Sequence, residues 1–210
     1  MPKIKQTTVY GFDELDERAK ERARDWFREG GFDYEWWDCT FDDAKQCLAL
    51  AGFAVDKIYF SGFSSQGDGA CFEGTWRASD AQPVKAMKAH ATQDKVLHAI
   101  AAECRAIAKL RPQAFARMKQ SGHYSHSGCV AYSIDCEREN DDVARTTAEW
   151  EARGKEDDAV EEQIKDVARS AMDWIYSQLE KEYDYMNADE QVDETIRANE
   201  YEFTEEGKRA

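Results

Sequence analysis

Two short glycine-bearing segments hold the side chains of this sequence that could do chemistry. The first reads SSQGDG at residues 64–69, and the second reads HYSHS at residues 123–127. Glycines allow left-handed dihedral angles and a close approach of the backbone, so amides of the first segment could cradle an anion. The segment lacks the Gly-Lys-Ser/Thr ending of a P-loop and the GxGxxG spacing, whereas Asp-Gly is typical of a hairpin turn. An ordinary turn is therefore the simpler interpretation.

Histidines and carboxylates near these segments could instead bind a metal ion. Imidazole and carboxylate groups suit zinc or a harder cation, and the set would comprise Asp68, Glu73, His123 and His126, or Asp135. Residues three apart on a regular strand face opposite ways, so the two histidines converge only if the chain bends between them. We therefore expect no metal and no other cofactor.

Cysteine chemistry is the third possibility. A thiolate nucleophile needs a nearby base or positive group, and Cys71 or Cys129 could pair with a histidine. The spacing fixes no such pair, and a small buried apolar residue is the usual role of cysteine. We expect no catalytic residue. The six cysteines form no CxxC pair and the N-terminus lacks the apolar run of a signal peptide, which predicts reduced thiols and a cytoplasmic protein.

One alternative function stays open on these residues: a small-ligand site, for a nucleotide or for metal-dependent hydrolysis, between the two loops. Loops that meet at one end of a sheet commonly form pockets. The residues of this predicted ligand site are Ser64, Ser65, Gln66, Gly67, Asp68, Gly69, Glu73, His123, Tyr124 and His126.

The acidic residues gather toward the C-terminus. The formal net charge is −15, and residues 137–210 hold 24 Asp and Glu against 10 Lys and Arg, which gives −14. A chain of this sign repels phosphate backbones, so we expect no direct binding of nucleic acid and a protein with a basic surface as partner. The exception would be residues 77–119, whose nine Lys and Arg could form an isolated basic face.

Exposed aromatic residues can anchor a protein interface. Adjacent tryptophans on a helix cannot both face the core squarely, so one of Trp36 and Trp37 should be partly exposed. Packing inside the domain is the equal alternative. The predicted partner-binding residues are Trp36 and Trp37 together with Glu161, Glu162, Asp166, Asp173, Glu180 and Asp184.

Hydrophobic periodicity predicts the elements that position these side chains. Apolar residues at helical spacing predict helices from Asp13 to Gly30, over 34–51, over 83–112 with a break near Thr92, and over 164–186. Alternating patterns with glycine turns predict β-hairpins over 56–76 and 118–135. A short helix and a β-prone EYEFT at residues 200–204 should end the chain.

These elements predict an α+β fold. We expect an antiparallel sheet built from the two β-hairpins, packed by an N-terminal αα-hairpin, central helices and a long C-terminal helix. Residues 1–210 should form a single domain, with a possible boundary at the polar tract 137–158 before an acidic helical segment at 159–210. No stretch approaches the roughly 18 apolar residues of a membrane span, so we expect no membrane association.

Four segments together resemble a known family. They read FDELDERAKERARDWFREGGFDYEWWD, DKIYFSGFSSQGDGACFEG, SGHYSHSGC and MDWIYSQLEKEYDYMNADEQVDETIRANEYEFTEEGKR. This text resembles small proteins encoded in bacteriophages and prophages that carry the label "antitoxin of toxin-antitoxin stability system". The resemblance covers nearly the whole chain and implies no catalytic residue, cofactor or substrate. It implies an inhibitor or modulator of a host system, such as an antitoxin, an anti-CRISPR protein or another anti-defence factor, acting in the bacterial cytoplasm.

Overall fold

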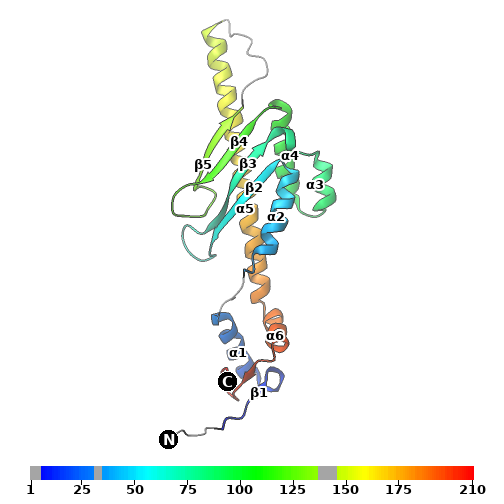
Figure 1. Ribbon diagram of the computed structural model, residues 1–210, viewed down its shortest axis with the longest axis vertical. Helices are drawn as coiled ribbons and strands as arrows, with labels where there is room; N and C mark the ends of the chain where they lie inside the picture. The colour runs from blue at the N-terminus through cyan, green and yellow to red at the C-terminus, as the bar shows by residue number, and fades with distance from the viewer. Residues whose placement is uncertain (1–5, 31–34, 137–145) are drawn as a thin grey trace. The chain divides into compact units, whose positions relative to one another are not determined.

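The computed structural model describes residues 6–30, 35–136 and 146–210, which form an α+β structure (Figure 1). Packing divides the chain into two compact units. Unit 1 comprises residues 1–37 and 181–210, and unit 2 comprises residues 38–180. The tract 137–158, where we expected a boundary if there was one, includes residues 137–145, which lie outside the described residues, and the first turns of a helix. The single domain stays a prediction.

Unit 2 contains a four-stranded antiparallel sheet of order β2-β3-β4-β5. Both predicted hairpins are confirmed: β2 (Phe53–Ser61) pairs with β3 (Gly69–Arg77), and β4 (Phe115–Gln120) pairs with β5 (Val130–Asp135). The hairpins join because β3 also pairs with β4, with Trp76 opposite Ala116. This order places both hairpin loops at the same end of the sheet.

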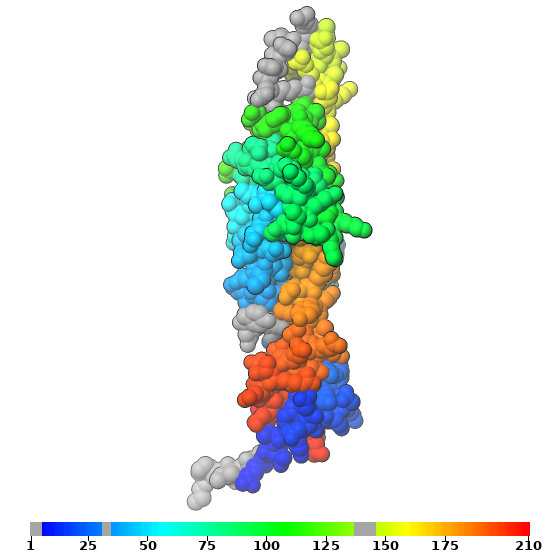
Figure 2. Space-filling view, turned by 90° about the vertical axis from the view of Figure 1, so that its right-hand side faces the viewer, coloured from blue at the N-terminus to red at the C-terminus, as the bar shows by residue number. Residues whose placement is uncertain are grey.

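Helices cover one face of this sheet (Figure 1), and Figure 2 shows the same segments as a surface, seen from the side. They are α2 (Asp38–Leu50), α4 (Lys95–Leu110) and the long α5 (Thr147–Asn187), while α3 (Val84–His90) lies beside α2 and α4. The core holds the rings of Phe53, Phe72 and Trp76, and the Trp76 indole N–H donates to the carbonyl of Ala51 at 3.0 Å. The polar tip of the largest buried side chain is thereby paired, which its burial requires.

The predicted break between the central helices is confirmed, since α3 ends at His90 and α4 begins at Lys95. Asp94 is the N-cap residue of α4. Its Oδ1 accepts the backbone N–H groups of Val96 and Leu97 at 3.0 and 2.9 Å and so caps α4. Its Oδ2 accepts the indole N–H of Trp174 on α5 at 2.8 Å. The Asp94 carboxylate therefore both caps the start of α4 and connects α4 to α5 by a hydrogen bond.

Helix α5 begins at Thr147, inside the polar tract 137–158 and before the helical segment that we expected at 159–210. A reciprocal capping box starts it: the Glu149 N–H donates to Thr146 Oγ1, and the Thr146 N–H donates to the Glu149 carboxylate. From Val160 onward one face is buried in the helix layer of unit 2. Its buried residues are Val160, Ile164, Val167, Ala168, Ala171, Met172, Trp174, Ile175 and Leu179.

Unit 1 brings together the two ends of the chain. Strand β1 (Tyr10–Gly11) pairs with β6 (Glu202–Phe203), and α1 (Glu17–Gly30) packs against α6 (Asp189–Ala198). The small core is formed by Phe12, Leu15, Ala19, Ala23, Val192, Ile196 and Phe203. A bidentate ion pair from Arg24 to Asp193, at 2.7 and 2.8 Å, fixes the two helices beside that core.

Two glycine substitutions test this packing. Gly52 ends α2 with a φ of +95°, and an added Cβ would lie 2.7 Å from the carbonyl oxygen of Arg77. We expect Gly52→Ala to lower the free energy of unfolding by about 2 kcal/mol or more, because it adds both a positive-φ strain and a backbone clash. Urea denaturation followed by circular dichroism measures the change.

Gly154→Ala is the matched control. Gly154 lies within α5 with no atom within 4 Å of an added Cβ, so alanine should be neutral or stabilising by up to about 1 kcal/mol. Equal stability of the two variants would contradict the described path from α2 into β2.

Candidate functional site

The two glycine-bearing loops come together, and side chains of the second loop pack closely against the glycines of the first segment. A Cβ added at Gly67 would lie 2.9 Å from the Tyr124 ring, and one added at Gly69 would lie 2.5 Å from the Cβ of His126. These glycines allow the loop between β4 and β5 to lie against the loop between β2 and β3. The residues of the predicted ligand site therefore lie where the two loops pack against each other, and their binding of a ligand stays a prediction.

The polar groups of these loops bind one another. Asp68 Oδ2 accepts the backbone N–H groups of Ser64 and Ser65 at 2.9 and 2.6 Å, and Glu73 Oε1 accepts that of Gln120 at 3.2 Å. The amides of Ser64 and Ser65 are therefore donors within their own turn. Gln66 is exposed at the tip of this turn.

His126 lies beside Cys129, with 3.4 Å between Nε2 and Sγ. The Gly128 N–H donates to His126 Nδ1 at 3.1 Å, so the neutral imidazole carries its proton on Nε2. To act as a general base, His126 would have to face the thiol with an unprotonated nitrogen. The nitrogen nearest the thiol is Nε2, which carries the proton in this tautomer. The pair is therefore not arranged for nucleophilic catalysis. His123 instead contacts the Tyr124 ring edge-on, with 5.4 Å between centroids.

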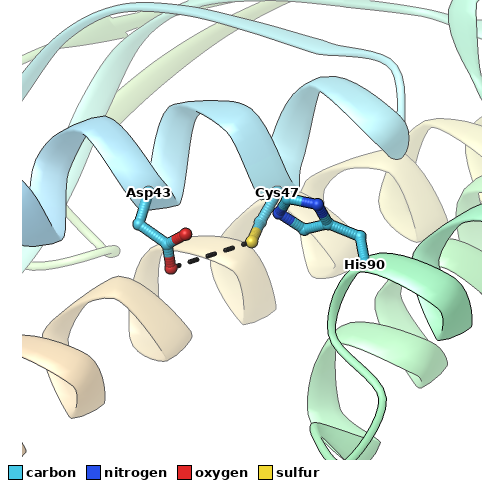
Figure 3. Close-up of side chains that lie close together, drawn as sticks. All are labelled: Asp43, Cys47 and His90. Atoms are coloured by element: carbon cyan, nitrogen blue, oxygen red, sulfur yellow. Dashed lines mark hydrogen bonds between the residues drawn. The ribbon is translucent and has the colours of Figure 1, made fainter.

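A different set of side chains meets in unit 2 (Figure 3). Among the described residues, one group of three potential metal ligands has all its ligand atoms within 4.8 Å of one another, and it consists of Asp43, Cys47 and His90. Asp68, Glu73, His123 and His126 form no such group. Burial first, and then the nearby carboxylates of Asp43 and Asp94, raise the pKa of the Cys47 thiol to about 11.

Sequence reasoning did not find this group. Asp43 and Cys47 are four residues apart on a predicted helix, so their shared face could have been noticed. His90 follows 43 residues after Cys47 and belongs to another helix. Only the packing of α3 beside α2 brings its ring to the thiol.

The predicted acidic surface lies on the exposed side of α5. Helical geometry places Glu162, Asp166, Asp173 and Glu180 within about 40° of one another around the helix axis, along roughly 27 Å. All four are exposed, whereas Glu161 is half-buried at the side of this row. Asp184 is exposed in the part of α5 that belongs to unit 1. We call Glu162, Asp166, Asp173 and Glu180 the acidic row.

Two cations lie among these carboxylates. Arg169 donates to Glu162 and Asp166 at 2.8 and 2.7 Å, and Lys165 lies 3.5 Å from Glu162 and 3.9 Å from Glu161. The hydrogen bond from Arg169 lowers the pKa of Glu162, which keeps this carboxylate ionised. Asp173 and Glu180 make no ion pair with another described residue. The end of the row nearer Glu180 therefore has the more available negative charge.

The two tryptophans are both half-buried. Their rings contact each other edge-on at 5.6 Å, and Trp36 contacts Tyr183 at 5.8 Å within unit 1. Neither indole faces solvent fully, so their part in partner binding stays a prediction.

The basic residues of 77–119 do not form one face. Arg77, Arg117 and Lys119 are exposed on strands of the sheet, Lys85 and Lys88 lie on α3, and further members lie on α4. Arg111 is buried and bound to Asp157 at 2.8 Å. The exception that would have favoured nucleic acid therefore lacks support in this arrangement.

The packing of the two loops can be tested through Cys71. Residues 69 and 71 alternate to the same side of β3, and Cys71 is fully buried, with a pKa raised to about 11 mainly by that burial. We expect Gly69→Ala to increase the rate of Cys71 alkylation by iodoacetamide at least tenfold, because the added Cβ displaces the loop at His126. Mass spectrometry of the labelled peptide gives the rate.

Gly122→Asn is the control for this experiment. Gly122 lies in the loop between β4 and β5, as His126 does, with a φ of +93° and open space around an added Cβ. Asn tolerates positive φ better than most residues. Unchanged protection of Cys71 in Gly69→Ala would mean that the loop does not pack there.

Comparisons with known proteins give a family and no named function. A search of curated proteins and a search of solved structures each found no match. No described helix has the length and apolar character needed to cross a membrane. A family model matches residues 36–189, which include all of unit 2, the Asp43 group and the acidic row. Since this match covers most of the sequence, the chain belongs to the family described as "Domain of unknown function (DUF8835)".

Proposed function

We propose that this protein is a binding protein that inhibits or modulates a host system, and that its acidic row meets a basic surface of a host protein. The observation that supports this proposal best is the two-sided character of α5. One side is buried in the core of unit 2, and the other presents Glu162, Asp166, Asp173 and Glu180 to solvent. A rigid core holds these charges in place, so little conformational entropy is lost when a partner binds.

The charge of the chain supports a basic partner. Most of the net charge of −15 belongs to residues 137–210, and clustered charge of one sign attracts an opposite surface over about a Debye length. A basic groove that binds nucleic acid recognises a row of negative phosphates. Carboxylates spaced along one side of a helix present a similar row of negative charge. The proposed partner is therefore a protein that itself binds nucleic acid.

The setting comes from the resemblance to phage and prophage proteins. It supports a role in the cytoplasm of a bacterial host, as an antitoxin, an anti-CRISPR protein or another anti-defence factor. The alternative, a nucleotide or hydrolase site between the hairpin loops, has less support. The two loops pack closely against each other, Asp68 and Glu73 accept backbone N–H groups, and the ligand atoms of the described residues Asp68, Glu73, His123 and His126 form no group that could hold one metal ion.

A charge-neutralised variant tests the proposal. We expect the combination of Glu162→Gln, Asp166→Asn, Asp173→Asn and Glu180→Gln to weaken binding to the host partner at least a hundredfold at about 0.15 M salt, since each close charge pair across an interface contributes on the order of 1 kcal/mol or more. The tagged wild type and variant are compared as baits in host lysate. Affinity for the captured protein is then measured by calorimetry at several salt concentrations.

The control neutralises the same number of exposed carboxylates elsewhere. Glu29→Gln, Glu190→Gln, Glu194→Gln and Glu205→Gln change the net charge equally but lie in unit 1. The proposal expects this control to keep its partner and the wild-type complex to weaken as salt rises. Equal loss in both variants would point to net charge alone, and a salt-insensitive complex would exclude the acidic row as the binding surface.

A further inference from the structure

Asp43, Cys47 and His90 bring three different metal-binding groups to one place in unit 2. Their carboxylate oxygen, thiol sulfur and ring nitrogen all lie within 4.8 Å of one another (Figure 3). We propose that these three side chains form a binding site for a zinc-like divalent cation that links α2 to α3. This site is independent of the acidic row and of the proposed host partner.

The backbone positions suit shared coordination. Asp43 and Cys47 are one helical turn apart on α2, the same i, i+4 spacing that lets two side chains of a helix bind one metal ion. Cys47 Sγ lies 3.9 Å from Asp43 Oδ2. Ligand atoms of a tetrahedral zinc centre with bonds of about 2.0–2.3 Å are about 3.3–3.6 Å apart. This pair would therefore close by well under 1 Å.

His90 supplies the third ligand from a second element. It is the last residue of α3, and both His90 and Asp43 are exposed while Cys47 is buried. The side chains of Asp43 and His90 can turn toward a cation without disturbing the core, because both residues are exposed. The buried thiol fixes the depth of the site, and the exposed ligands leave an entry path from solvent.

The chemistry of the three groups selects the class of cation. Thiolate and imidazole are ligands that zinc, cobalt and iron prefer, whereas magnesium and calcium prefer oxygen alone. An ionised thiolate and carboxylate would together balance the charge of one divalent ion. Three protein ligands also leave a fourth tetrahedral position for water or another small ligand.

Asp94 is a stabilising neighbour and not a fourth ligand. Its Oδ1 caps α4 and its Oδ2 accepts the Trp174 indole N–H, so both oxygens are engaged by hydrogen bonds at 2.8–3.0 Å. Its charge is close enough to act on Cys47. A cation in the site would gain from this fixed negative charge.

Metal titration of the purified full-length chain tests the site. After dialysis against a chelator and then against chelator-free buffer, we expect one zinc ion to bind per chain in competition with a chromophoric chelator. Cobalt(II) should give the absorption of a thiolate-to-cobalt charge-transfer band, and magnesium should give no competition. Zinc should also raise the melting temperature, because a ligand that binds only the folded state stabilises it.

His90→Gln and Asp43→Asn are the decisive variants, since both residues are exposed and their substitution should not prevent folding. Each should weaken zinc binding more than about tenfold, because the loss of a residue that only hydrogen-bonds to a metal ligand already lowers metal affinity by at least that factor. Cys47→Ala should abolish the cobalt charge-transfer band, with circular dichroism confirming that the variant is folded.

The matched controls carry the same residue types nearby or on the surface. Asp42→Asn, Cys39→Ala and His123→Gln are exposed and outside the group, and they should bind zinc like the wild type. The site is refuted if the wild type binds no stoichiometric zinc, if His90→Gln binds it with unchanged affinity, or if the cobalt band persists in Cys47→Ala.

Discussion

Burial of one side of α5 is the constraint on which the rest of unit 2 depends. Ile164, Val167, Met172, Ile175 and Leu179 are each almost fully removed from water, and burying a large aliphatic side chain contributes on the order of 1.5–3 kcal/mol. The same helix then has to expose its opposite side. Because the apolar and acidic positions share one rigid backbone, the core determines where the acidic row can lie.

The hairpin loops show how a chemically suggestive sequence can serve packing instead. Gly67 and Gly69 are required because Tyr124 and His126 approach them more closely than any Cβ would permit. Asp68 accepts the N–H of Ser64 in the turn, and Glu73 accepts the N–H of Gln120 at the end of β4. These backbone groups would otherwise need other partners. The loops thus pack together at one end of the sheet, where the carboxylates of Asp68 and Glu73 accept backbone hydrogen bonds.

Much of the fold could be predicted from the sequence because its rules are local. Alternation with a glycine turn, Asp68-Gly69 in one case and Ser127-Gly128 in the other, indicated the two hairpins. Helical spacing indicated the buried side of α5. The early start of α5 was also readable, since Thr146 and Glu149 form a capping box that the polar composition of the tract obscured. The Asp43 group could not be predicted, because it depends on the packing of α3 beside α2. The contacts of His123 and His126 likewise could not be predicted, because they depend on how the two hairpins join through β3 and β4.

The central claim is that the acidic row is the surface that the host partner covers. Carboxyl footprinting with a carbodiimide and an amine, followed by mass spectrometry, measures this directly in the isolated complex and in the free protein. Our account predicts that Glu162, Asp166, Asp173 and Glu180 lose most of their labelling in the complex, while Glu194 and Glu205 keep theirs. Undiminished labelling of the acidic row in a complex that is demonstrably formed would contradict it.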